Sequence, residues 1–132
     1  MQRKISALFV LRIGLGINML MHGLVRIPKL SSFADKMAEG FSQTLLPDVL
    51  VRSFLLVLPL AEFAAGVLIL WGGRWTRLGF VAGSFILAAL LFGTTLKEDW
   101  GTAGSQLVYV IGFAFGIYLY DKDLHPEKTV QN

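Results

Sequence analysis

The chain has 132 residues, enough for one domain, but with 55% hydrophobic and only 16% charged residues it is too apolar for an ordinary soluble protein. The net charge of +3 comes from Lys and Arg residues that stand singly or in pairs at the ends of apolar runs, which is typical of membrane-edge charge and argues against nucleic-acid binding. The absence of cysteine excludes disulfides, thiolate metal sites and a thiol relay within this chain. We therefore predict an integral protein of the lipid bilayer, with no nucleic-acid partner and no metal site.

Four apolar runs are long enough, or nearly so, to cross a bilayer core of about 30 Å, which takes about 20 helical residues. They cover residues 5–27, 49–71, 78–96 and 102–120. Each run is apolar nearly all round, as expected of a helix that contacts both lipid and other helices. The predicted fold is an all-α, four-helix membrane bundle, a single domain over residues 1–132 with a polar C-terminal tail at 121–132. The first run begins like a signal peptide, but Arg12 interrupts it, so we expect a retained membrane helix.

The connections between the runs differ in length. In the first, Phe33, Met37 and Phe41 recur every four residues while the charged residues between them face away, which predicts a short amphipathic helix on the membrane surface. The second connection, residues 71–77, is predicted to be a tight turn.

Four crossings place both termini on one side of the membrane, and Lys and Arg are almost equally divided between the two sides. The basic residues of the terminal side are concentrated at helix ends, among them Arg3, Lys4, Arg74 and Arg77. This concentration favours cytoplasmic termini in a bacterial inner membrane.

Polar residues inside the apolar runs are the candidate functional groups. Arg12 lies within the first run, where a charge at mid-membrane costs roughly 2.5 to 3.5 kcal/mol, and Glu62 is the one acidic residue inside another run. At about 1.5 Å of rise per residue from the middle of each run, Glu62 lies near the midplane and Arg12 about 6 Å toward the terminal side, as deep as Ser84. We therefore predict an ion pair between Arg12 and Glu62.

A second polar layer is predicted closer to the far surface. Asn18, His22 and Arg26 are spaced four residues apart and share one helix face. The same depth estimate places Asn18 level with Tyr109 and His22 level with Gln106. The candidate ligand-binding residues are Arg12, Asn18, Ser84, Gln106 and Tyr109.

Glu62 and His22 are the candidate catalytic residues, because burial can bring carboxylates and imidazoles toward useful pKa values. Structural alternatives stay open for each group. Arg12 and Glu62 can form a purely structural ion pair, His22 can be a hydrogen-bonded interfacial histidine, and Gln106 and Tyr109 can serve helix packing.

From Leu11 to Leu119 the chain resembles the DoxX family of small four-helix membrane proteins, which includes the DoxD-like subunits of thiosulfate:quinone oxidoreductase. The matching residues form three blocks: Arg12, Gly16, His22, Gly23, Lys29 and Leu30; Glu62, Gly66, Leu68, Leu70 and Gly72; and Asp99 with Trp100. The resemblance implies redox roles at the quinone pool or in sulfur and oxidative-stress metabolism for some members, and assembly roles for distant relatives.

The leading hypothesis is a quinone-linked redox subunit, in which a quinone or small anion meets His22, Asn18 and Gln106 while Glu62 exchanges a proton. With His22 as the one histidine in the bilayer, a bis-histidine haem within the chain is not expected, so a partner subunit or free quinone would supply electrons. Two alternatives are a non-enzymatic helper of another membrane complex and a small transporter, although the known dimeric exporters carry their acid in the first helix. Whether catalysis occurs, whether a membrane or soluble redox partner binds, and whether the chain forms homo-oligomers stay open.

Overall fold

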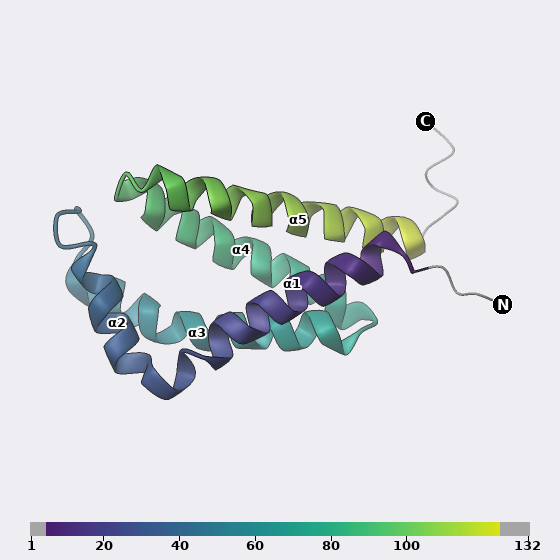
Figure 1. The fold of residues 1–132 in the computed structure, drawn as a ribbon, viewed down its shortest axis with the longest axis horizontal. Coiled ribbons are helices and arrows are strands. Elements are labelled where there is room, and N and C mark those ends of the chain that lie inside the picture. The colour runs from purple at the N-terminus through teal and green to yellow at the C-terminus, as the bar shows by residue number, and fades with distance from the viewer. Residues whose placement is uncertain (1–4, 125–132) are drawn as a thin grey trace.

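The computed structural model describes residues 5–124, which form α-helices packed lengthwise, with no strand in that range (Figure 1). The four long helices are α1 (Ala7–Leu24), α3 (Asp48–Trp71), α4 (Arg74–Leu96) and α5 (Trp100–Leu124). All four belong to helical segments long and apolar enough to cross a membrane. The predicted all-α class and the four membrane-length helices are thus confirmed.

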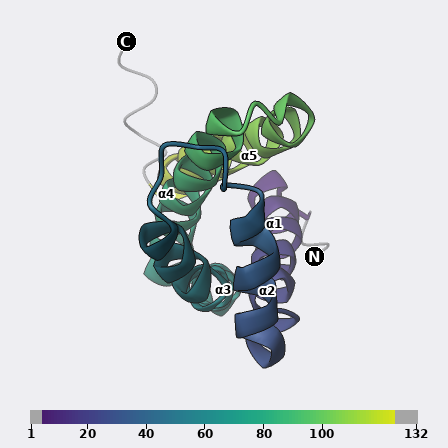
Figure 2. The same cartoon turned by 90° about the vertical axis from the view of Figure 1, so that its left-hand side faces the viewer.

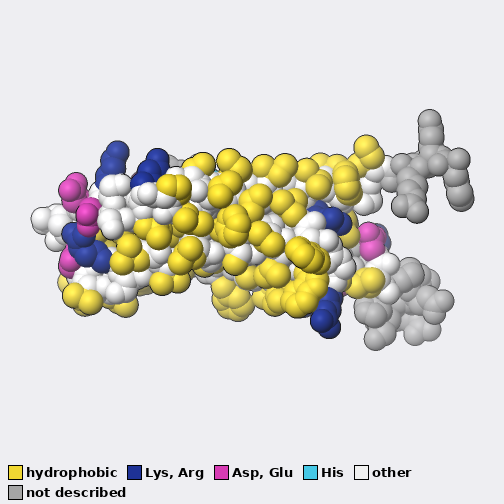
Figure 3. Space-filling model, turned by 90° about the horizontal axis from the view of Figure 1, so that it is seen from below, with side chains coloured by type: hydrophobic (Ala, Val, Ile, Leu, Met, Phe, Trp, Pro, Cys, Tyr) yellow, Lys and Arg dark blue, Asp and Glu magenta, His cyan; other side chains and the backbone are white. Residues whose placement is uncertain are grey.

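The surface is divided along the long axis of the bundle. Hydrophobic side chains cover the middle, and charged side chains gather toward the two ends (Figure 3). Large apolar residues such as Phe85, Val108 and Ile111 are exposed along the outside of the helices. An exposed apolar surface of this extent fits contact with lipid.

The α1 segment is longer than predicted. A short 3-10 helix, η1 (Ile27–Lys29), and α2 (Leu30–Glu39) follow α1 closely, so that the stretch from Ala7 to Glu39 counts as one helical segment with a membrane-length apolar part, not as a span with a detached surface helix. The chain bends at η1, and α2 lies against the first half of α3 (Figures 1 and 2). Small side chains decide which face packs, since Ala34 and Ala38 are buried.

The two ends of α3 have clear local causes. Pro47 precedes α3, and Asp48 places an acid in its first turn, where the helix dipole is positive. At the other end, Gly72 and Gly73 have φ values of 106° and 56°, a left-handed conformation that glycine adopts without strain. This pair reverses the chain at once, so α4 begins at Arg74 and the predicted turn over residues 71–77 is too long.

The end of α5 also differs from the prediction. Residues 121–124 of the predicted tail are helical, because α5 continues to Leu124. Residues 125–132 of that tail, like Arg3 and Lys4, lie outside the described residues.

The bundle is closed by contacts in the order α1, α3, α4, α5 and back to α1 (Figure 2). Phe80 and Phe113 are fully buried at its centre and meet edge to face, with ring centroids 6.2 Å apart. The tightest interface joins α1 to α3. A Cβ added to Gly23 would lie 2.3 Å from the carbonyl oxygen of Pro59, and one added to Gly66 would lie 2.3 Å from the amide nitrogen of Leu20.

Candidate functional site

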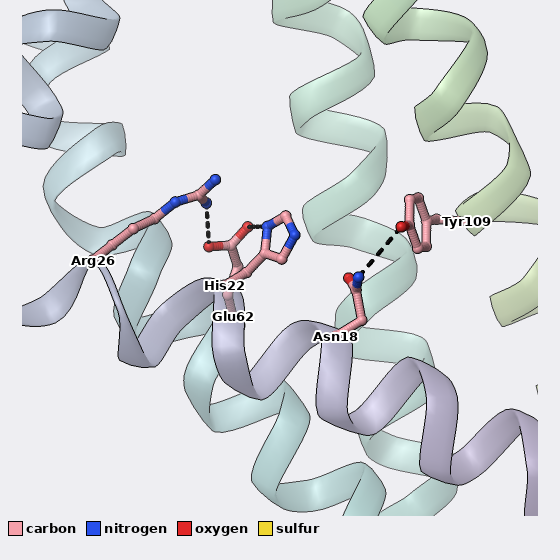
Figure 4. Close-up of polar contacts among 5 residues, drawn as sticks. All are labelled: Asn18, His22, Arg26, Glu62 and Tyr109. Carbon is pink, nitrogen blue, oxygen red and sulfur yellow. Dashed lines mark hydrogen bonds and ion pairs between the residues drawn. The ribbon is translucent and has the colours of Figure 1, made fainter.

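Glu62 is the centre of the polar cluster inside the bundle. It lies in α3 with only 2% of its surface exposed, and its Oε2 accepts a hydrogen bond from Arg26 Nη1 at 2.8 Å (Figure 4). On the other side, His22 Nδ1 lies 3.8 Å from Glu62 Oε1. The side chains of His22 and Arg26 are 45% and 26% exposed. A buried carboxylate therefore contacts two cationic or titratable groups that reach the surface.

The sequence explains this arrangement locally. His22 lies in the last turn of α1, and Arg26, two residues beyond the end of that helix, keeps a helical backbone conformation, so the two side chains lie on one side of the chain. Gly23 lies between them and lets α1 approach the backbone of α3 at Pro59 and Phe63. The Arg26 guanidinium also lies 4.8 Å from the ring centre of Phe33, so α1, α2 and α3 together hold the cluster.

The predicted ion pair between Arg12 and Glu62 is wrong. Arg12 Nη2 instead donates a hydrogen bond at 3.0 Å to the carbonyl of Leu70, near the end of α3. The depth estimate aligned the middles of the two apolar runs, whereas in the structure Gly16 contacts Leu70, ten positions further along α3 than that alignment requires.

Arg12 therefore caps the carboxyl end of α3 by donating a hydrogen bond to one of its last carbonyl groups. The last carbonyls of a helix lack helical donors, and a cation is favourable at this end of the dipole. The Nε of Arg12 is buried without a hydrogen-bond partner within residues 5–124.

The second predicted layer forms only in part. Asn18 Nδ2 donates to Tyr109 Oη at 3.3 Å, which confirms the predicted common level of these two residues (Figure 4). Ser84 donates its hydroxyl to the carbonyl of Phe80 in its own helix at 2.9 Å. Gln106 makes no hydrogen bond with His22, and its Oε1 is buried without a partner in the described part of the chain. The polar groups thus form separate clusters and not one continuous column.

Arg26, and not the predicted Arg12, is the arginine that pairs with Glu62. It was expected near the far surface, beyond the deep ionic layer. The four-residue spacing from His22 was the signal that could have placed it beside the carboxylate, together with Gly23 and Gly66, the two small residues that mark the contact between α1 and α3.

A cavity of about 500 Å³ lies elsewhere in the bundle, between α2, α3, α4 and α5. Its polar lining comes from the end of α4 and the start of α5, and its apolar lining mainly from α3 and α4. The polar residues are Thr94, Lys97, Asp99, Thr102 and Gln106. Neither Glu62 nor His22 lines the cavity, but Gln106, one of the predicted ligand-binding residues, does.

Asp99 directly precedes α5 and accepts a hydrogen bond from its first turn. The backbone N–H of Thr102 donates to Asp99 Oδ1 at 3.1 Å, as in a helix N-cap. Hydrogen bonds from Thr102 hold the pKa of Asp99 below its ordinary value of 3.8. Asp99 is therefore a carboxylate at neutral pH, close to the ammonium of Lys97.

Residues 5–124 contain no group of three or more His, Asp or Glu side chains placed to hold a metal ion. Comparisons with protein-family models, with curated proteins and with solved structures found no match for this chain. Function must therefore be inferred from the residues and their geometry.

Proposed function

We propose that this chain is a DoxX-like, quinone-linked redox subunit that binds a quinone or similar small ligand between its helices. The observation that carries the proposal is the contact between buried Glu62 and half-exposed His22. A carboxylate inside a bundle with a titratable group leading to its surface is suited to exchange protons with a ligand.

The three residues of the cluster would have different tasks. His22 turns Nδ1 toward Glu62, while its second ring nitrogen points away from the carboxylate (Figure 4). The imidazole can thus take up a proton at one nitrogen and release one from the other. Glu62 would hold the proton, and Arg26 would fix the carboxylate through its 2.8 Å hydrogen bond.

Hydrogen-bond donors for a quinone carbonyl lie one turn of α1 away from His22. Tyr109 Oη accepts from Asn18 Nδ2, so the tyrosine hydroxyl hydrogen can be donated to a ligand. A bound quinone would supply two-electron, two-proton chemistry. The chain's own residues offer donors and a proton route, and a partner protein or a second quinone would supply electrons.

The proposal includes a position in the membrane. The termini would be cytoplasmic, in a bacterial inner membrane, and α2 would lie at the opposite surface. The pairing of Arg52 with Asp35 of α2 and Asp48 of α3 gathers charge at that end of the bundle, which supports the surface position of α2.

Binding of a short-chain ubiquinone analogue to the full chain in nanodiscs tests the site. We expect Glu62→Gln and His22→Ala each to weaken binding at least tenfold, about 1.4 kcal/mol or more. Thr95→Ala is the matched control, since its hydroxyl donates to the carbonyl of Leu91 in the same helix and the variant should leave binding unchanged. If both site variants fold and bind as the wild type does, the proposed site is misplaced.

A second function, a non-enzymatic partner that stabilises another membrane complex, is favoured by the closed ion pair of Glu62 and Arg26, which can be purely structural. In that case a mild-detergent pulldown from native membranes should recover one partner in stoichiometric amount. Failure to recover any such partner, together with quinone binding that depends on Glu62, would exclude this alternative.

A further inference from the structure

The cavity among α2, α3, α4 and α5 has two chemically different ends. Leu50, Phe54 and Leu55 of α3 and Leu90 of α4 give it an apolar wall, and its polar groups all belong to residues 94–106, around the connection between α4 and α5. A volume of about 500 Å³ is within the range of sites that hold one small ligand. An occupant that matches both ends has a hydrocarbon body and a polar head.

The charges at the polar end restrict the head group. Lys97 and Asp99 both line the cavity, so a cationic head would meet a lysine and an anionic head would meet a carboxylate. Lys97 is also engaged with the ring of Phe41, its Nζ lying 4.7 Å from the ring centre. An uncharged head group avoids both repulsions.

Gln106 indicates which uncharged group is needed. It lines the cavity, and its Oε1 is buried without a hydrogen-bond donor within residues 5–124. A buried acceptor without a donor costs about 1–3 kcal/mol, so a ligand that donates a hydrogen bond to it gains that energy back. A hydroxyl both donates to the amide oxygen and accepts from the amide nitrogen.

We propose that this cavity binds a single-chain amphiphile with an uncharged hydroxyl head, the chain against Phe54, Leu55 and Leu90 and the hydroxyl hydrogen-bonded to Gln106. The site is separate from the cluster of His22, Arg26 and Glu62, and it does not depend on the function proposed for that cluster.

The test is photolabelling of the full chain in nanodiscs with a tetradecanol that carries a diazirine on its chain. Labels are expected on residues 50–55 and 89–93. Unlabelled tetradecanol should compete about five- to tenfold better than tetradecyl methyl ether, because the ether lacks the one hydrogen that Gln106 needs. Gln106→Leu should abolish the difference between alcohol and ether.

A pair of neighbouring alanines separates the cavity from the lipid-facing surface. Both Ala88 and Ala89 are exposed in α4, but only Ala89 lines the cavity. Ala89→Phe should reduce labelling of residues 50–55 at least fivefold, and Ala88→Phe should leave it unchanged. Both variants are checked for an unchanged helical circular dichroism spectrum.

Three results would overturn the proposal. One is labelling spread evenly over the outside of all helices, as expected of a probe dissolved in lipid. Another is equal competition by alcohol and ether in the wild type, and the third is labelling that survives Ala89→Phe at full strength.

Discussion

The interface between α1 and α3 and the cavity end of the bundle are packed in opposite ways. Along α1 and α3, Gly16, Gly23 and Gly66 bring the helices so close that an added Cβ would collide with the opposite helix. Around the cavity, the side chains of α2, α3, α4 and α5 leave about 500 Å³ between them. The interface of α1 and α3 is close-packed, whereas the region around the cavity leaves room for a ligand.

The difference matches the chemistry of the two regions. A carboxylate in a low-dielectric interior needs its partner at hydrogen-bond distance, and the close approach of α1 delivers Arg26 to 2.8 Å from Glu62. An amphiphile needs volume and a suitable wall and tolerates small displacements. We therefore expect substitutions at the interface of α1 and α3 to change stability, and those at the cavity to change ligand occupancy.

The largest effect is expected from Arg26→Met. It leaves the Glu62 carboxylate buried without its guanidinium, and breaking such a pair costs about 3 kcal/mol or more. The free energy of unfolding is measured in detergent micelles. The double replacement Arg26→Met with Glu62→Leu should be more stable than Arg26→Met alone, with a coupling energy of about 1–3 kcal/mol.

A second double replacement controls this experiment. Arg12 and Glu62 do not touch, so the costs of Arg12→Met and Glu62→Leu should add within about 0.5 kcal/mol. A coupling between Arg12 and Glu62 as large as that of Arg26 and Glu62 would contradict the placement of both arginines.

Gly23→Ala is expected to destabilise by about 1–3 kcal/mol, because its methyl group would meet the backbone of Pro59 and Phe63. Gly14→Ala in the same helix is the control. No atom lies within 4 Å of a Cβ added at Gly14, so alanine there should be neutral or stabilise through helix propensity. Thermal unfolding of the two variants compares them directly, and equal midpoints would mean that α1 and α3 are further apart than described.

Tyr109→Phe should cost about 0.6 kcal/mol, the average for a hydrogen bond between membrane helices, since it removes the acceptor of Asn18. The effect should vanish when Asn18 is already replaced by Leu. Tyr118→Phe, at an exposed position of α5, serves as the control and should not change the free energy of unfolding measurably. Persistence of the Tyr109→Phe cost in the Asn18→Leu background would contradict the bond.

The smallest effect concerns Asp99 at the cavity end. Its pKa in the folded protein is lowered from 3.8, so the stability that its carboxylate contributes is fully present above that pH and is lost as the pH falls through the lowered pKa. Asp99→Asn should remove this acid-side loss while leaving neutral-pH stability nearly unchanged, because Asn also caps helices. Thermal midpoints measured from about pH 6 down to about pH 2 test it, and parallel curves for both proteins would count against the cap.

The sequence predicted the class of fold well, because four apolar runs of membrane length leave little choice once backbone groups must be satisfied within helices. The lengths of the turns were predicted less accurately. Only the left-handed φ values of Gly72 and Gly73 make the reversal after α3 as short as two residues. The amphipathic pattern around Phe33 indicated the packed face of α2, since Phe33 and Phe41 pack beside the buried Ala34 and Ala38, but it did not tell that this face meets α3.

The sequence identified residues of the candidate site better than it identified which of them contact each other. Depth along a helix correctly matched Asn18 with Tyr109, two residues near the middle of their runs. It failed for Arg12 and Glu62, because the relative shift of two helices depends on which small side chains permit close contact and not on where the apolar runs are centred. Gln106 was predicted as a ligand residue, but the cavity it lines depends on side chains from four helices, which no single periodicity describes.

The ion pair of Arg26 and Glu62 also bears on how the chain is made. The two residues are 36 positions apart, so during synthesis α1 and α2 leave the ribosome well before the acid that Arg26 binds. Since chains grow from the N-terminus, the pair cannot close until α3 has followed α1 into the membrane. If α1 and α3 meet before the later helices insert, α4 and α5 would join a helix pair in which Glu62 already has Arg26 as its counter-charge.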